Sequence, residues 1–460
     1  MKNRQTFRFG LGAALLVCTS VAIAQRPTAI TNARIHTMAG EVIEAGTVII
    51  RDGKIAAVGS DVDVPGGAIV VDAKGGTVMP GLVSAYSTAG LQGPRAAPRR
   101  GGRGQRRRGG RGRGQRAPAS TGPMGNNAAT KVADGLYARQ DVFRELLDAG
   151  VTSLAVAPAG AGFPGQGALL DPSGADRASL VVNDSAFIAI NPANNTRAKT
   201  LLKDSFALAA EVVEDRKNPG SQRTGQAQAD QGEQQRGQQN RRQNRRGGGR
   251  GRRGTAGRRG GRGRGQSQQP RKDENTDALA DLLEGKKRGL IALGSATDVL
   301  HYLDAVGETR FSATILARSI AANDGPFDLV LDELRDLNAP VLMSAQLSQK
   351  PNTNQISNPA KDLSGAGIEV GFIVGDNKRA VTALFANLIN LVRHGLSGEA
   401  ALRGVTVVPA RMLGIDDQVG SIETGKTANL LLWSTDPLNP TAKLVHVWHA
   451  GVDVKEIPRR

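Results

Sequence analysis

The chain has 460 residues, a formal net charge of +18 at neutral pH and one cysteine, Cys18. Cys18 lies in a segment predicted below to be removed, so the mature chain has no thiol nucleophile and no zinc–thiolate site. The net positive charge comes from two segments and not from the rest of the chain. Residues 92–117 and 216–272 together carry +25, and the remainder of the chain sums to −7.

The amino-terminal segment 1–24 predicts a secretory signal peptide. It begins with Lys2, Arg4 and Arg8, continues as a short apolar run and ends in Ala22-Ile23-Ala24. The apolar run is too short to cross a bilayer, which argues against a membrane anchor. We therefore expect cleavage before Gln25, export across the inner membrane, and a periplasmic or extracellular mature protein.

The next stretch, from Ile30 to Pro80, alternates short β-branched runs with turn signals at 51–54 and 65–67. This spacing predicts a meander of short strands, which forms the amino-terminal part, 25–79, of a small β-domain.

Farther along, helical periods alternate with apolar strands, which is typical of a parallel α/β sheet and, over this length, of a (β/α)8 barrel. The segments are Asp141–Ala149 and Val151–Ala157, Ala278–Leu283 and Leu290–Leu293, then Leu303–Leu316, Leu329–Met343, Ile368–Val374 and Ala380–His394.

Two inserts interrupt this pattern, at 92–117 and 216–272. Both are rich in Arg, Gly and Gln and lack aromatic residues, so they cannot bury enough apolar surface to fold and are predicted to be disordered. Such cationic segments bind polyanions. An anionic lipid or glycan fits better than nucleic acid, because no aromatic side chain is interleaved for base stacking. The alternative is that the inserts are solvated low-complexity expansions that the fold tolerates and that bind nothing.

Val78 to Gly90, VMPGLVSAYSTAG, resembles the end of the first barrel strand in the amidohydrolase superfamily. The stretch from Gly395 to Leu438 resembles that family's last barrel helix and its return to the β-domain. The resemblance to the imidazolonepropionase-like branch implies a barrel over 80–415 and a small composite β-sandwich domain, whose second part is 416–460. It also implies hydrolysis of non-peptide C–N bonds at zinc or another divalent metal.

The metal-binding residues that the resemblance implies are missing. Ser84 stands at the family's aspartate, Tyr86 and Thr88 stand at its two histidines, and Ala292 and Gly294 fall where a later His-x-His would lie. No cofactor is therefore predicted.

Asp376 is the one metal-binding residue of the family that is kept. It falls at the end of the last barrel strand, where the family's aspartate binds metal and moves a proton. It is the candidate catalytic residue, and a solvated or helix-capping aspartate is the alternative. The five histidines, His36, His301, His394, His446 and His449, all fall away from strand ends that would face the barrel mouth.

Two glycine-rich patterns suggest nucleotide binding only superficially. The phosphate-loop pattern at 420–427 is followed by a predicted strand, whereas that loop requires a helix. The pattern at 160–165 contains Pro164, which lacks an N–H, and is interpreted as a βα loop at the barrel mouth.

The resulting hypothesis is an amidohydrolase-family barrel that has lost its metal centre and binds a small molecule, a second copy or an active paralogue. Two alternatives stay open. One is an active hydrolase that uses Asp376 with an atypical metal or none. The other is a protein that binds polyanions or membrane surfaces through its inserts.

Overall fold

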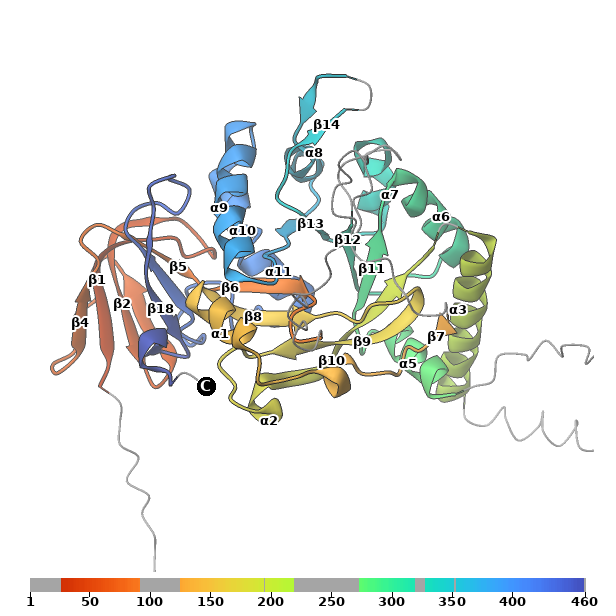
Figure 1. Ribbon diagram of the computed structural model, residues 1–460, viewed down its shortest axis with the longest axis horizontal. Helices are drawn as coiled ribbons and strands as arrows, with labels where there is room; N and C mark the ends of the chain where they lie inside the picture. The colour runs from red at the N-terminus through yellow and green to blue at the C-terminus, as the bar shows by residue number, and fades with distance from the viewer. Residues whose placement is uncertain are drawn as a thin grey trace, which may run out of the picture.

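The computed structural model describes residues 26–91, 125–193, 195–218, 273–318, 327–350 and 353–458. The predicted signal peptide, the first insert and residues 219–272 of the second lie outside these ranges. The described part contains two large β-sheets that lie side by side, with helices around the larger one (Figure 1), and a third, two-stranded sheet.

The larger sheet has nine strands and is nearly closed, which confirms the predicted barrel. Its main order is β16-β13-β12-β11-β10-β9-β8-β6, with β7 paired to β9. The strands are β6 (Leu82–Ser87), β7 (Gly125–Asn126), β8 (Val151–Val156), β9 (Gly162–Leu170), β10 (Val181–Asn191), β11 (Gly289–Leu293), β12 (Ala313–Ala317), β13 (Val341–Met343) and β16 (Val370–Phe372).

The first and last strands of this sheet are joined through a short connecting segment. The Phe372 amide of β16 donates to the Gly404 carbonyl (2.7 Å), and the Val83 amide of β6 donates to the Val405 carbonyl (3.0 Å). Residues 404–405 therefore bridge β16 and β6 and complete most of the ring.

β9 departs from the regular (β/α)8 pattern because it runs antiparallel to both β8 and β10. The predicted βα loop at 160–165 is therefore wrong from Gly162 onward. The glycines of β9 allow close packing rather than a loop: a Cβ on Gly167 would lie 2.1 Å from the Phe187 ring.

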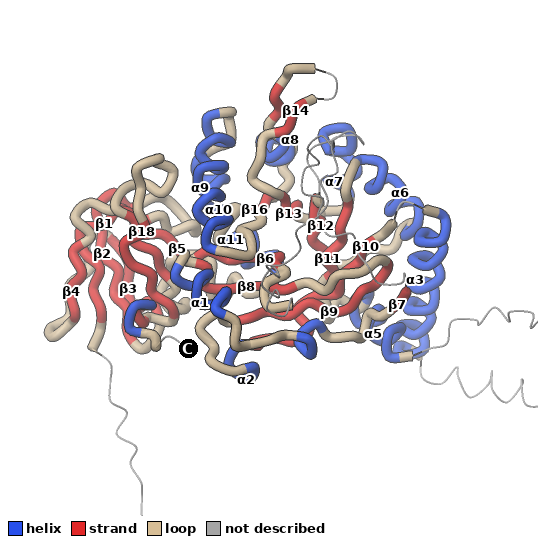
Figure 2. The backbone as a smooth tube through the Cα atoms, in the orientation of Figure 1, coloured by secondary structure: helices blue, strands red, loops and turns tan. Residues whose placement is uncertain are grey.

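Helices surround the barrel (Figure 2). They are α1 (Asp141–Asp148), α2 (Arg177–Leu180), α3 (Thr196–Lys217), α5 (Glu274–Leu283), α6 (Ala296–Val306), α7 (Leu331–Asp336), α8 (Pro359–Gly365), α9 (Lys378–Arg393), α10 (Gly398–Arg403) and α11 (Val407–Leu413), with 3-10 turns η1 (Val132–Gly135), η2 (Phe327–Val330) and η3 (Val454–Glu456). Within the described ranges, no helix has the length and apolar character needed to cross a membrane.

Sequence chemistry explains where α9 begins and which face it buries. The Asn377 side chain accepts a hydrogen bond from the Ala380 amide, which caps the helix. Apolar residues then recur every three or four positions, so one stripe faces the core. The buried members are Val381, Leu384, Phe385, Leu388 and Leu391.

The smaller sheet is a composite of both chain ends, as expected. Its strands are β1 (Thr28–Ile35), β2 (Ile43–Arg51), β3 (Lys54–Gly59), β4 (Ile69–Asp72), β5 (Thr77–Pro80), β17 (Leu430–Trp433), β18 (Leu444–His449) and β19 (Val452–Asp453). β5 pairs antiparallel with β17, which joins the two ends through backbone hydrogen bonds. A hairpin of β14 (Ser348–Gln349) and β15 (Ile356–Ser357) is separate.

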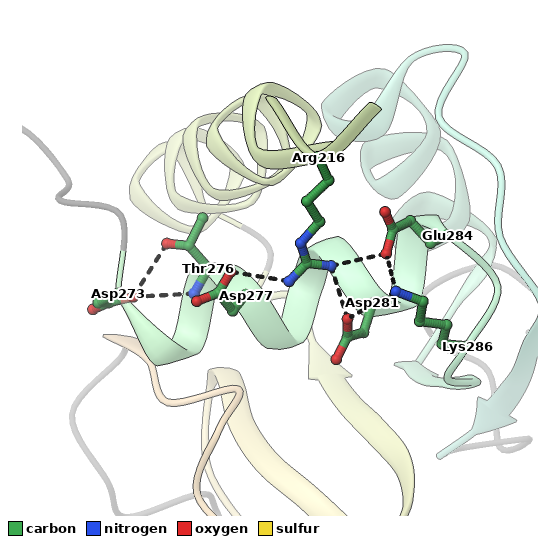
Figure 3. Close-up of polar contacts among 7 residues, drawn as sticks. All are labelled: Arg216, Asp273, Thr276, Asp277, Asp281, Glu284 and Lys286. Carbon is green, nitrogen blue, oxygen red and sulfur yellow. Dashed lines mark hydrogen bonds and ion pairs between the residues drawn. The ribbon is translucent and has the colours of Figure 1, made fainter. Parts of the chain in front are cut away.

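Arg216, at the carboxyl-terminal end of α3, forms ion pairs with acidic residues along α5 (Figure 3). Its guanidinium contacts Asp277 (3.0 Å), Asp281 (2.9 Å) and Glu284 (2.8 Å). Arg216 and Lys217 lie in the last turn of α3. The predicted start of the second insert at 216 was therefore wrong by at least two residues, because acidic partners on α5 give Arg216 a folded role that composition cannot show.

We expect Arg216→Gln to lower the free energy of unfolding by about 1 kcal/mol, since partly exposed ion pairs contribute modestly and three are lost together. Urea denaturation measures the effect. Lys203→Gln, an exposed position on the same helix, is the matched control and should leave the midpoint unchanged. Equal midpoints for the two variants would show that the α3–α5 contact contributes nothing.

Candidate functional site at the barrel mouth

The candidate site lies where the first and last strands of the barrel end. β6 ends at Ser87 and is followed by Thr88. Asp376 lies in the segment between β16 and α9, directly before the capping residue Asn377. Carboxyl ends of barrel strands form the face on which such folds build their sites, and Asp376 lies in the segment that follows the last of these strands.

Asp376 is held by three hydrogen bonds from the end of β6. The Ser87 hydroxyl donates to Oδ1 (2.6 Å), the Thr88 amide donates to the same oxygen (3.1 Å), and the Thr88 hydroxyl donates to Oδ2 (2.6 Å). The Ser87 oxygen also accepts from the Ala89 amide (2.9 Å), which fixes its orientation. We call Ser87, Thr88 and Asp376 the hydroxyl clamp.

Tyr86 and Ser84 occupy two of the positions at which the family resemblance expects metal ligands. Ser84 is fully buried and donates to the Tyr86 carbonyl (3.1 Å). Burial raises the pKa of the Tyr86 hydroxyl; the positive charge of Arg318 lowers it and the negative charge of Asp376 raises it. The Tyr86 phenol is therefore neutral at physiological pH, and it shares the mouth with a cation and a carboxylate.

Ala292 and Gly294 provide no ligand group, and the surrounding polar atoms are used for helix capping. Ala292 is buried within β11. The Gly294 amide donates to Asp298 (2.9 Å), and the Ser295 side chain accepts from the Asp298 amide (3.2 Å). This end of β11 therefore initiates α6, and the Asp298 carboxylate there accepts the Gly294 amide hydrogen bond.

The five histidines have structural surroundings. His301 lies within α6, His394 caps the end of α9, and His36 follows β1 with its pKa lowered mainly by burial. His446 contacts Asp453 (2.7 Å), and His449 Nε2 contacts Asp171 Oδ1 (2.9 Å). The last pair joins the composite sheet to the segment after β9, and the two histidines have different partners, as their i, i+3 spacing on a strand predicts.

A divalent metal of the kind that the family implies does not fit this mouth. Across the described ranges, no three His, Cys, Asp or Glu side chains come together as a metal site. Asp376 already accepts on both oxygens, and the groups around it are hydroxyls and the Arg318 cation rather than imidazoles. Hydrolytic zinc sites use three protein ligands from His, Glu, Asp or Cys.

The phosphate-loop pattern is a turn, as predicted. Lys426 is bound to the Ser421 hydroxyl (2.6 Å), the Asp416 carbonyl (2.7 Å) and Glu423 (2.6 Å), and β17 follows instead of a helix. Its ammonium group is therefore committed to the turn itself.

Sequence reasoning missed Ser87 and Arg318. Strand alternation places Ser87 on the face opposite Tyr86, and only the end of β6 at Ser87 lets its hydroxyl reach Asp376. Arg318 directly follows β12, and its position at the same mouth would have been visible from the strand ends alone.

Comparisons with known proteins agree with this geometry. The amidohydrolase family model matches residues 273–454. An amidohydrolase from Thermotoga maritima aligns over 93% of this chain and 99% of its own, with a TM-score of 0.67 and 18% identity. The protein is an α/β barrel with a composite β-domain, and its residues 273–454 are similar to the amidohydrolase family.

A shorter similarity involves the amidohydrolase tasK of Hapsidospora irregularis. It is 41% identical over 58 residues, which are 13% of this chain and 6% of that protein. The match therefore spans only a small part of that relative.

Thr88→Val should lower the free energy of unfolding by roughly 1–2 kcal/mol, because it removes a hydrogen bond to a charged acceptor at nearly constant shape. Asp376→Ala should cost roughly 2–3 kcal/mol, since it leaves the buried Ser87 hydroxyl without its acceptor. Chemical denaturation measures both. Thr309→Val is the control, because no side-chain hydrogen bond is seen for Thr309 in the described structure. A clamp without structural effect would give all three variants the wild-type midpoint.

The Asp171–His449 pair predicts a pH dependence of stability. Burial alone would raise the pKa of Asp171, but the hydrogen bond and charge of His449 and two hydrogen bonds from Ser173 outweigh it and hold that pKa below its usual value. A carboxyl with a lowered folded pKa adds stability that is present above its unfolded pKa of about 3.9 and is lost as pH falls through the folded value.

Asp171→Asn should therefore destabilise the protein at pH 7 and have a shrinking effect below about pH 4, where the wild-type carboxyl becomes protonated. Urea denaturation from pH 7 to pH 3 tests this. Asp63→Asn, an exposed position, controls for net charge. A difference between Asp171→Asn and wild type that stays constant with pH would contradict the linkage.

Proposed function

We propose that this amidohydrolase-family protein is a non-catalytic member, in which the hydroxyl clamp takes the structural place of a metal centre. The single observation that supports the proposal is the saturation of Asp376 by Ser87 and Thr88. The proposed role is binding of a small molecule or a protein partner at the barrel mouth, in the exported compartment that the amino-terminal segment predicts.

The energetics favour this proposal over metal-free hydrolysis by Asp376. Zinc lowers the pKa of bound water from about 15.7 to about 7. Without it, hydroxide at the site is scarcer by an amount worth on the order of 12 kcal/mol. General-base catalysis by one carboxylate increases the rate by only about 10²–10⁴-fold.

Similarity to the amidohydrolase family makes hydrolysis of C–N bonds the rival function, and a direct assay tests it. The wild-type chain is purified from zinc-supplemented medium, its metal content is measured by mass spectrometry, and it is assayed on a panel of cyclic amides. We expect substoichiometric metal and no turnover above that of Asp376→Ala. One metal per chain together with turnover that Asp376→Ala abolishes would overturn the proposal.

A variant designed to bind zinc provides a complementary test. Combining Tyr86→His with Thr88→His supplies two imidazoles beside Asp376 and removes one donor of the clamp. Three protein ligands suffice for an open zinc site, so this variant should bind about one zinc per chain. Adding Asp376→Ala should reduce that binding again. If the double variant binds no more zinc than wild type, the clamp is not at the position of a metal centre.

A further inference from the structure

A groove of about 860 Å³ lies away from the barrel mouth, along α9 where that helix passes the composite sheet. Its other side is formed by α1, by β17 and β18, and by the loop around Pro437 and Pro440. Figure 2 shows α9 beside β18 of the composite sheet. The volume lies within the range of small-molecule sites, roughly 300–1,000 Å³.

Much of the groove wall is apolar, and two aromatic side chains contribute to it. Phe385 and Trp433 pack with ring centroids 4.6 Å apart, and Ile389 and Val447 lie among the lining residues. Val445 also lines it and is 40% exposed. The small side chain of Ala386, exposed on α9, leaves space between them. An elongated apolar body would cover this surface.

Two exposed cations line the same groove at opposite ends of α9. Lys378 begins the helix and Arg393 ends it, roughly 22 Å apart along the axis. In the described structure, neither side chain has an ion pair or hydrogen bond. Arg144, by contrast, is committed to Asp148 and to the carbonyls of Val454 and Ile457.

The two free cations are not equivalent for an anion. The amino-terminal end of a helix carries partial positive charge and the carboxyl-terminal end partial negative charge. An anion at Lys378 gains from both the ammonium and the helix dipole, whereas the dipole opposes an anion at Arg393. The Lys378 end is therefore the favoured anion position.

Trp433 forms part of the wall along which the apolar body would lie. It is only 7% exposed, and it lines the groove beside Phe385.

We propose that this groove binds a long-chain carboxylate. The chain lies along Phe385, Trp433 and Ile389, and the carboxylate lies at Lys378. The proposal is independent of the barrel mouth and of whether the protein hydrolyses anything.

Trp433 supplies the readout, because the chain has only one other tryptophan, Trp448. In the full-length Trp448→Phe variant, the fluorescence of Trp433 is followed while dodecanoate is added below its micelle concentration, and calorimetry gives the stoichiometry. We expect a saturable shift at about one dodecanoate per chain. Dodecanol should bind about tenfold more weakly, because it lacks the charged contact.

Three substitutions in the same background locate the site. Ala386→Phe should abolish binding by filling the groove, whereas Ala383→Phe, an exposed alanine of α9 outside the groove, should bind as before. Lys378→Gln should weaken dodecanoate about tenfold and leave dodecanol unchanged. Arg393→Gln should change neither by more than about twofold.

Several results would overturn the proposal. These are no saturable binding, equal binding by Ala386→Phe and Ala383→Phe, or equal affinity for the acid and the alcohol. Binding of an acidic heptapeptide but not dodecanoate would assign the groove to a peptide partner. A dimer in sedimentation velocity that Ala386→Phe breaks would assign it to a second copy.

Discussion

The carboxylate of Asp376 joins two strand ends of the barrel that share no direct backbone pairing. β16 and β6 each bond to the segment 404–405, so the ring is closed there by two backbone contacts. The hydroxyl clamp adds three hydrogen bonds at the mouth, all to one charged acceptor. Charge-assisted hydrogen bonds are shorter and stronger than neutral ones. The clamp is therefore the cross-link on which the arrangement of the mouth depends.

The composite sheet is joined to the barrel directly before β6. β5 pairs with β17 and leads directly into β6, so the junction between the two ends of the chain is continuous with the first barrel strand. The Gly81 amide donates to the Asn429 carbonyl (2.8 Å) at this point. A Cβ on Gly81 would lie 2.3 Å from the Thr152 hydroxyl, so only glycine permits this approach. The packing of α9 against this junction creates the groove lined by Trp433.

Local patterns predicted much of the fold and the position of Asp376. The helix at α9 and the strands β8 and β11 follow from periodicity, since their apolar positions decide which face is buried. The composite sheet, the position of Tyr86 in β6 and that of Thr88 just after it followed from motifs at the two chain ends.

What sequence reasoning missed depends on contacts between distant residues. The glycines of β9 suggest a loop until the Phe187 ring is placed against Gly167. The ion pairs of Arg216 depend on acids about sixty residues farther along the chain. Ser87 points away from the site by strand alternation, and only the end of β6 brings its hydroxyl to Asp376. None of these partners can be identified from a local window.

Tyr86 and Thr88 stand at two neighbouring ligand positions of the family motif, yet they act differently toward Asp376. Thr88 gives it a hydroxyl and a backbone amide, whereas Tyr86 remains a neutral phenol whose pKa is raised chiefly by burial. Without donors, a half-buried carboxylate would be costly. The hydroxyls remove that cost without adding positive charge, and Arg318 supplies a positive charge from the end of β12. The charge of Asp376 is thus balanced by side chains of the mouth itself, which is the physical basis of the proposed non-catalytic role.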